Sequence, residues 1–426
     1  MNVEPTVIYP VEKFLLAFAL ILIASKLFGE IAERIKQPSV LGELIAGVIL
    51  GGSVLAVIPS VTGEPGYNTF HLLSEIGVSI LLFEIGLETD LKSLLKVGID
   101  SALVAIIGVI TPFVLGYAAI VMFDRYGLLG SGLSPGAVML IALTVGATLT
   151  ATSVGITARV LSDLRQLHTP EAKVILGAAV IDDVIGLIIL AVVSGIIEAT
   201  ESGVHANVSV VGVGYITLKA FGFLLVAIAL GNLFSKRLFD LVNKMRVRGV
   251  LLVISLAFAL LFAYVADLMG LAPIVGAFAA GLVLANTNQF ELISERLKPV
   301  ADVFTPIFFV VVGTAVNIRV FNPFHEANLP VLLIALTLTV IAVVSKLASG
   351  LGITKKGIRR LSVGVGMIPR GEVGLIFAQV GLGFAVFDRQ FFSAITVMVM
   401  LTTFLAPPLL KLTFPRKPGE EGGETK

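Results

Sequence analysis

The stretch IAERIKQPSVLGELIAGVIL, residues 31–50, is followed much later in the chain by a related stretch, VADLMGLAPIVGAFAAGLVL, residues 265–284. The two stretches keep the same order of small and apolar residues. Gly42 stands opposite Gly276, and an Ala-Gly pair follows four residues after each. This likeness between distant parts of the chain is the first indication of how the protein is organised.

The likeness continues in the next apolar block of each half. FEIGLETDL, which begins at Phe83, is matched by VVVGTAVNI, which begins at Val310, and Gly86 stands opposite Gly313. Small and aliphatic residues are common in such blocks, so chance similarity is the alternative explanation. The same order of matches across three consecutive blocks argues against chance. We interpret the two stretches as copies of an internal repeat.

Long apolar blocks make up most of the chain. Of the 426 residues, 57% are hydrophobic and 14% are charged, against roughly 25% charged in soluble domains. The blocks reach the length of about 20 residues that a helix needs to cross a bilayer core of roughly 30 Å. An all-α polytopic membrane protein is therefore expected. The absence of Cys excludes disulfides and thiolate chemistry, and the net charge of +1 gives no reason to expect nucleic acid.

Charge clusters divide the apolar blocks into about thirteen expected spans. They cover residues 14–33, 39–58, 71–88, 101–122, 135–160, 172–197, 208–232, 249–269, 271–286, 299–316, 329–351, 360–384 and 390–412. The first and eighth spans open the two repeats and are an odd number of spans apart, so the two copies are expected to be inverted in the membrane. Inverted repeats are typical of secondary transporters, whose binding sites lie near the midplane at interrupted helices.

The positive charges support this division and give an orientation. Most of the 30 Lys and Arg residues fall in loops after odd-numbered spans or in the C-terminal tail. The loops on the other side hold only Lys13, Arg125, Arg319 and Arg389. Since cytoplasmic loops carry the excess of positive charge, the N-terminus is expected outside the plasma membrane and the tail, residues 415–426, in the cytoplasm. The tail is rich in Gly, Glu and Lys and is expected to be disordered.

Two adjacent aspartates stand in the middle of the sixth span, LGAAVIDDVIGLIILAVVSG. A charged residue at the centre of a span costs roughly 2.5–3.5 kcal/mol, so Asp182 and Asp183 indicate a function. Neighbours on a helix point about 100° apart, so one carboxyl can face a cavity and the other a neighbouring helix. A buried carboxyl can hold a proton or, deprotonated, a dehydrated Na⁺, and the two ions then compete. The alternative is a structural pair held by hydrogen bonds.

A lysine lies within the eleventh span, VLLIALTLTVIAVVSKLASGLGI. Lys346 either extends to the nearby cytoplasmic surface or forms an ion pair with one of the aspartates. A buried lysine changes its protonation readily, so such a pair could form and break with proton load. Both interpretations are compatible with the sequence.

The fifth span, AVMLIALTVGATLTATSVGITARVL, is dense in Thr, Ser and Gly. Thr150, Thr152 and Ser153 cluster at its centre. This composition suits an interrupted helix whose carbonyls and hydroxyls face a cavity. Ordinary close packing of small residues between helices is the alternative.

The twelfth span carries Pro-Arg-Gly-Glu at its centre, which predicts a break in the helix. Arg370 and Glu372 are expected to pair with each other or with the fifth span, and structural support is favoured over direct ion binding. The two interrupted spans are seven apart, as an inverted repeat requires. Five further acids lie inside spans and are not assigned as primary ligands. They are Glu43, Glu75, Glu84, Asp267 and Asp302.

These features resemble the monovalent cation:proton antiporter-2 family, in particular its NapA-type sodium/proton antiporters, and the resemblance covers nearly the whole chain. The segments that carry it are LLFEIGLETDL (81–91), ATLTATSVGITARVL (147–161), GAAVIDDVIGL (177–187), Lys346 and MIPRGEVGL (367–375). The resemblance implies an NhaA-like fold in one transporter unit, residues 1–414. Its core domain would cover about 71–197 and 299–384, with two crossed interrupted helices. Its dimerisation domain would cover about 14–58, 249–286 and the remaining helices.

The resemblance also implies roles for the polar residues. Asp183 would be the essential ion-binding group, and the only protein group assigned to Na⁺, while Asp182 would pair with Lys346. Relatives with an Asp-Asp pair are usually electrogenic homodimers that move their core like an elevator. No cofactor is expected, because Na⁺ or Li⁺ and H⁺ would be the transported ions.

Three other functions compete with Na⁺(Li⁺)/H⁺ antiport. K⁺/H⁺ antiport on the same fold is the nearest, although Asp182 favours sodium because potassium-moving relatives often have Gln-Asp. A cation channel needs neither the inverted repeat nor paired carboxylates. An intramembrane aspartyl protease needs two carboxylates from different segments that share a proton, whereas these aspartates are adjacent on one helix. The protein is therefore not expected to be an enzyme.

Overall fold

The computed structural model describes residues 9–35, 37–59, 64–88, 98–129, 133–167, 169–201, 237–242, 244–269 and 271–414, with single or paired residues between 218 and 235. Within these ranges the regular elements are α-helices and short 3₁₀ helices. They are α1 (Val11–Arg34), α2 (Ser39–Leu50), α3 (Tyr67–Glu88), α5 (Ile99–Arg125), α6 (Pro135–Thr148), α7 (Val154–Asp163), α8 (Pro170–Glu201), α10 (Val250–Leu268), α11 (Pro273–Leu284), α12 (Phe290–Thr314), η1 (Ile318–Phe321), η2 (Glu326–Asn328), α13 (Leu329–Leu347), η3 (Ala348–Gly352), α14 (Arg360–Gly366), α15 (Glu372–Gly383) and α16 (Arg389–Thr413).

Eight of the described helices are long and apolar enough to cross a membrane, and four shorter apolar helices accompany them. This confirms the expected all-α polytopic fold. Each expected span contains one or two of these helices, except the span at 208–232, most of which lies outside the described residues. The tail at 415–426 also lies outside them.

Local sequence explains where several helices begin. Ser134 accepts a hydrogen bond from the Ala137 N–H at the start of α6, and Pro135 occupies the first helical position. Asp388 caps α16 in the same way, through the Phe391 N–H at 2.8 Å. Such side chains satisfy amide groups that a helix N-terminus leaves without partners.

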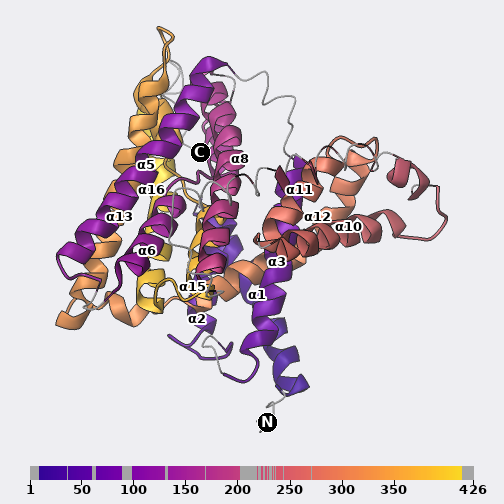
Figure 1. Cartoon of the computed structure of the whole chain (residues 1–426), viewed down its shortest axis with the longest axis horizontal. Coiled ribbons are helices and arrows are strands. Elements are labelled where there is room, and N and C mark those ends of the chain that lie inside the picture. The colour runs from indigo at the N-terminus through magenta and orange to yellow at the C-terminus, as the bar shows by residue number, and fades with distance from the viewer. Residues whose placement is uncertain are drawn as a thin grey trace, which may run out of the picture.

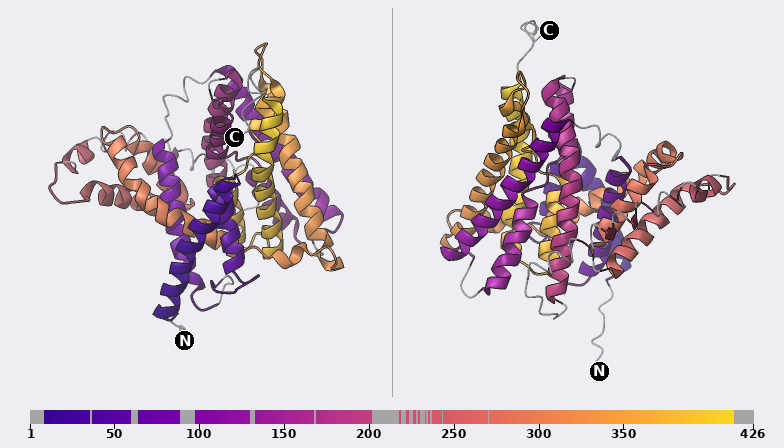
Figure 2. Two further views of the ribbon diagram at one scale, coloured as in Figure 1. Left: turned by 180° about the vertical axis from the view of Figure 1, so that it is seen from behind. Right: turned by 45° about the horizontal axis from the view of Figure 1, so that its top comes forward.

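The described helices form two bundles, which stand side by side in Figure 1. The first bundle contains α1, α2, α3, α10, α11 and α12, and the second contains α5–α8 and α13–α16. Extensive helix–helix contacts among the described residues all lie within one bundle or the other. The predicted core domain placed residues 71–88 and 299–316 with the second bundle, whereas these contacts join α3 and α12 to the first. Figure 2 shows the two bundles from behind and tilted.

Glycines of the internal repeat lie where helices of the first bundle approach most closely. A Cβ on Gly47 of α2 would collide with the Val310 carbonyl and Gly313 of α12. At the equivalent place in the other copy, a Cβ on Gly281 of α11 would collide with α3 at Gly86. The two copies are thus interlocked, since the second helix of each copy packs on the third helix of the other. Glycine allows helices in a bilayer to approach this closely.

Both interruptions expected in the second bundle are present. Residues 149–153 separate α6 from α7, and residues 367–371 separate α14 from α15. Pro369 has no N–H and disfavours helical geometry in the preceding residue, which explains the second break. In the first break the Thr and Ser hydroxyls offer the backbone alternative hydrogen bonds.

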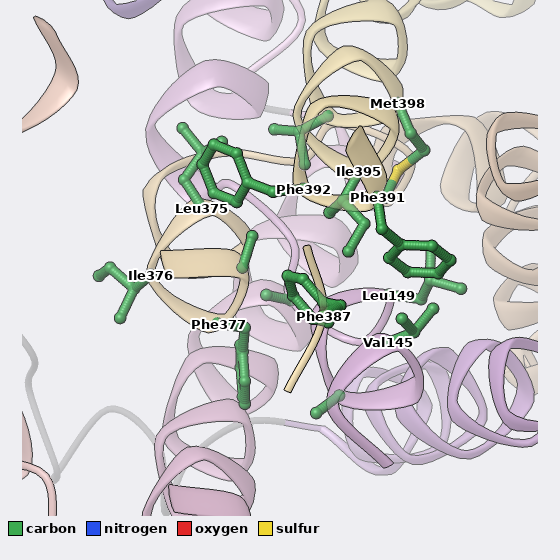
Figure 3. Packing of buried hydrophobic residues seen from close by; sticks show 14 of the residues in the cluster. Val145, Leu149, Leu375, Ile376, Phe377, Phe387, Phe391, Phe392, Ile395 and Met398 are labelled. Atoms are coloured by element: carbon green, nitrogen blue, oxygen red, sulfur yellow. The ribbon is translucent and has the colours of Figure 1, made fainter. Parts of the chain in front are cut away.

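A cluster of buried apolar side chains holds the interrupted helices in place (Figure 3). Val145 and Leu149 at the end of α6 belong to the same cluster as Phe377 of α15 and as Phe392 and Met398 of α16. Since lipid is as apolar as these side chains, their close fit contributes more to the stability of the bundle than their removal from water.

Candidate functional site

The first element of the site is an ion pair in the interior of the second bundle. The Lys346 Nζ atom of α13 lies 3.1 Å from the Asp182 Oδ2 atom of α8, and neither side chain has exposed surface. Charges in a low-dielectric interior are tolerated when they are paired. The alternative that Lys346 extends to the cytoplasmic surface does not fit this burial.

Asp182 retains one acceptor at this position. Its Oδ1 atom is buried and accepts no hydrogen bond from the described residues. Asp183 follows on α8, and its side chain lies outside the described residues.

The two chain breaks lie directly against each other. The Ser153 N–H of the first break donates to the Pro369 carbonyl of the second at 2.9 Å. The Thr152 hydroxyl donates to the Met367 carbonyl at 3.3 Å, and the Thr157 hydroxyl of α7 donates to the Gly366 carbonyl at 2.9 Å. Each break thus supplies hydrogen-bond partners that the other lost when its helix was interrupted.

Arg370 joins both breaks to a third helix. Its side chain is fully buried, and its guanidinium donates to the Ala151 carbonyl at 2.6 Å and to the Ala342 carbonyl of α13 at 3.5 Å. Its own carbonyl accepts a hydrogen bond from the Thr403 hydroxyl of α16. A positive charge at the carbonyl end of α6 is attracted to the negative end of that helix dipole. It also interacts electrostatically with Asp182.

A cavity with a volume of about 380 Å³ lies between the two bundles. His71 and Glu75 of α3 and Asp267 of α10 line it from the first bundle, and Ser194 of α8 and Gln379 of α15 line it from the second. Its walls therefore include α8, which carries both aspartates, and α15, the second half of the interrupted twelfth span. The cavity lies toward the ends where α3 begins and α8 ends.

Comparison with known proteins identifies the family of the chain. The sodium/hydrogen exchanger transmembrane family matches residues 17–414. The chain belongs to this family.

Two relatives and one solved structure are similar to this exchanger over nearly its whole length. The high-affinity Na⁺/H⁺ antiporter NhaS3 of Synechocystis is 40% identical, with 96% of this chain and 92% of that protein covered. The Na⁺/H⁺-K⁺ antiporter GerN of Bacillus cereus is 35% identical, with 95% and 97% covered. The structure of the sodium proton antiporter MjNhaP1 from Methanocaldococcus jannaschii matches with a TM-score of 0.68, 19% identity and 93% and 96% covered. At that identity it shows a shared fold.

The remaining residues singled out from the sequence occupy varied positions in the exchanger. The Thr150 hydroxyl donates to the Ala147 carbonyl of its own segment at 2.7 Å. The Glu372 side chain lies outside the described residues. Glu43 is buried in α2, whereas Asp302 is exposed on α12. Among the described side chains, no three acids or histidines are grouped as a metal site would require.

Sequence reasoning missed two contacts that shape the exchanger site. Thr157 supports the second break, and Thr403 of α16 supports Arg370. Thr157 lies within the same hydroxyl-rich stretch as Thr152, so its composition was a weak signal. No sequence signal indicated the contact of Thr403, because its partner, Arg370, is 33 residues away in the sequence.

Proposed function

We propose that this exchanger moves Na⁺, or Li⁺, across a membrane in exchange for protons at the Asp182–Asp183 pair. The observation that carries the proposal is the fully buried Lys346–Asp182 ion pair within the bundle whose two chain breaks are hydrogen-bonded to each other. Family membership and the similarity to the Na⁺/H⁺ antiporter NhaS3 support sodium as the ion. Thr152, Ser153 and Arg370 would hold the broken helices in register rather than bind the ion.

The two aspartates would divide the work. Asp183 would carry either a proton or a dehydrated Na⁺, whose preferred ligands are oxygens, and the two ions would compete for it. The Asp182–Lys346 ion pair would form and break as the ion load changes, because an ion pair in the interior is stable only while both charges are present. A lysine that releases its proton during the cycle would make the exchange electrogenic.

Alternating access would come from movement of one bundle against the other. Among the described residues, the closest helix approaches lie within each bundle, and the bundles meet through apolar side chains such as Val78, Phe278 and Phe308. An interface of this kind supports such a movement. The cavity between α3, α10, α8 and α15 supports access to the site from one side. Under the expected orientation, with the N-terminus outside the plasma membrane, this cavity lies toward the outer surface.

A homodimer through the first bundle completes the proposal. On α1, apolar side chains such as Leu15, Leu16 and Ile23 are more than half exposed, and on α10 Val253 and Leu261 are similarly exposed. These faces must meet either lipid or a second copy of the chain. Cross-linking of single cysteines placed on α1, in a chain that has no native Cys, would distinguish the two.

The test is proton movement in proteoliposomes that contain the purified chain and an internal pH dye. Addition of Na⁺ or Li⁺ is expected to release trapped protons, and Asp183→Asn is expected to abolish the signal. Asp302→Asn, which changes an exposed carboxylate on α12, is the matched control and should keep the activity. Full activity in Asp183→Asn would exclude the proposed site.

Potassium is the rival ion, because GerN is described by its name as a Na⁺/H⁺-K⁺ antiporter. The same assay separates the two. A response to K⁺ alone would reassign the transported ion while leaving the site in place. Currents far above carrier turnover in a planar bilayer would instead indicate a channel.

A further inference from the structure

The end of α13, which carries Lys346, is attached to α5 through a buried carboxylate that the exchange mechanism does not use. The Asp100 Oδ1 atom accepts hydrogen bonds from the Thr354 N–H at 2.9 Å and from the Thr354 hydroxyl at 2.5 Å. Asp100 is 2% exposed, and its Oδ2 atom is buried without a hydrogen-bond partner among the described residues. Thr354 follows η3, which continues directly from α13.

The chain between Lys346 and Thr354 is held along its length. The Ser349 hydroxyl donates to the Lys346 carbonyl at 2.6 Å. A Cβ on Gly352 would collide with the backbone of α5 at Val104, so η3 lies directly on α5. Movement at Thr354 is therefore transmitted to the last turn of α13.

One face of α5 makes all of these contacts. Asp100 binds Thr354, Val104 meets Gly352, and a Cβ built on Gly108 would lie 3.5 Å from the Lys346 Nζ atom. Residues four apart share a face of a helix, so the three positions lie in one row along the same face of α5. The same helix packs extensively against α8, which carries Asp182.

We propose that Asp100 is a positioning residue for the Lys346–Asp182 ion pair: by holding Thr354 it fixes η3 on α5 and thereby seats the Lys346 ammonium opposite Gly108. The proposal rests on the proposed function, in which this ion pair takes part in exchange. Two other charged groups interact with the carboxylates of this arrangement. Lys355 interacts with the Asp100 carboxylate, and Arg370 interacts with Asp182.

The test compares the pH profile of Na⁺-driven proton flux among variants. In the proposed function Lys346 takes up and releases a proton, so Lys346→Gln is expected to change this profile. Asp100→Asn is expected to move the pH of half-maximal rate in the same direction by roughly 0.5–1 unit, since one unit corresponds to a tenfold change in protonation. Thr354→Val should produce a smaller shift in the same direction, and Thr354→Ser should restore the wild-type profile. If Asp100→Asn does not fold, the two Thr354 variants carry the test.

A matched control separates positioning from general stability. Glu171 is a second carboxylate, 5% exposed, which accepts hydrogen bonds from the Arg359 N–H and Nε at 3.2 and 3.3 Å. Glu171→Gln should lower the melting temperature and leave the pH profile unchanged. An equal shift in Glu171→Gln would show that any loosening alters the profile, and would overturn the proposal.

Dependence on Lys346 gives the decisive comparison. In a Lys346→Gln background, Asp100→Asn should cause no further shift, because the group it positions is absent. A wild-type profile in Asp100→Asn, or the same shift with and without Lys346, would overturn the proposal. Melting temperatures of the two single variants and the double variant test the coupling without transport. Coupled melting in a chain that shows no cation-driven flux would reject the proposed function and keep the positioning role.

Discussion

Lys346 and Asp182 are 164 positions apart in the sequence, yet their side chains meet at 3.1 Å with no exposed surface on either. The contact joins α13 to α8 inside a bundle whose other buried polar groups are engaged mainly with backbone carbonyls. It is the place where loss of one group leaves a buried charge without its partner.

Removal of Lys346 should destabilise the protein more than removal of both charges. Lys346→Gln leaves the Asp182 carboxylate without its hydrogen-bonded ammonium, at a cost of about 3–5 kcal/mol. Asp182→Asn/Lys346→Gln removes both charges of the pair, and the nearby Arg370 guanidinium keeps its two carbonyl partners. Melting temperatures in detergent at pH 8 measure the difference. Lys13→Gln, at an exposed position in the first turn of α1, is the control and should melt like the wild type. If the decrease in melting temperature of the double variant equalled the sum of the decreases in the two single variants, the ion pair would be contradicted.

Arg370 should not be replaceable by lysine. Its guanidinium reaches carbonyls on two segments, Ala151 and Ala342, and a lysine cannot present donors in this fork. Each lost charged hydrogen bond costs about 1.5–3 kcal/mol, so Arg370→Lys should lower the initial exchange rate about tenfold or more. Arg359→Lys alters a partly exposed arginine outside the breaks and should keep most of the rate. Equal rates in the two variants would show that the fork is dispensable.

The repeat predicts that two distant glycines respond alike. Gly47→Ala and Gly281→Ala each place a methyl group against the backbone of the partner helix, and such overpacking costs typically about 1–3 kcal/mol. Both variants should therefore lose a similar amount of thermal stability. Gly98→Ala, where a Cβ meets no other atom within 4 Å, is the control. A loss confined to one of the two glycines would show that the copies are not mechanically equivalent.

The sequence predicts some features well because their causes are local. Pro369 is sufficient to interrupt a helix, and Asp182 and Asp183 are conspicuous in an apolar span. Features that depend on tertiary contacts are harder to predict. Residue similarity made Gly47 equivalent to Gly281, but it gave no sign that each packs against the other copy's third helix. For the same reason the resemblance places residues 71–88 and 299–316 in the core domain, whereas α3 and α12 pack in the first bundle.

The role of Asp100 illustrates the same limit. It stands directly before the expected span 101–122, where an acid is common because of the helix dipole. Only the fold brings Thr354, which is 254 positions away, to its carboxylate. Asp183, in contrast, is identified from the sequence, and its assignment as the ion-binding group stays a prediction.

Glu75 should affect ion access from one side of the membrane. It lines the cavity between the bundles, close to His71 on its own helix at 3.9 Å, and its side chain is 42% exposed. A carboxylate at this position attracts cations before they reach the aspartates, by an interaction that water weakens to about 0.2–1 kcal/mol. Glu75→Gln should therefore raise the half-saturating Na⁺ concentration on the cavity side up to about fivefold, with an unchanged maximal rate.

Vesicles of opposite sidedness provide the measurement for Glu75. The increase is expected when Na⁺ is added on the cavity side and not when it is added on the other side. It should also diminish at high ionic strength, because salt screens exposed charges. Glu84→Gln changes a partly buried acid on the same helix that does not line the cavity, and it is the matched control. If both substitutions raise the half-saturating concentration on both sides, the effect comes from the charge of the bundle as a whole, and the cavity is not the path of entry.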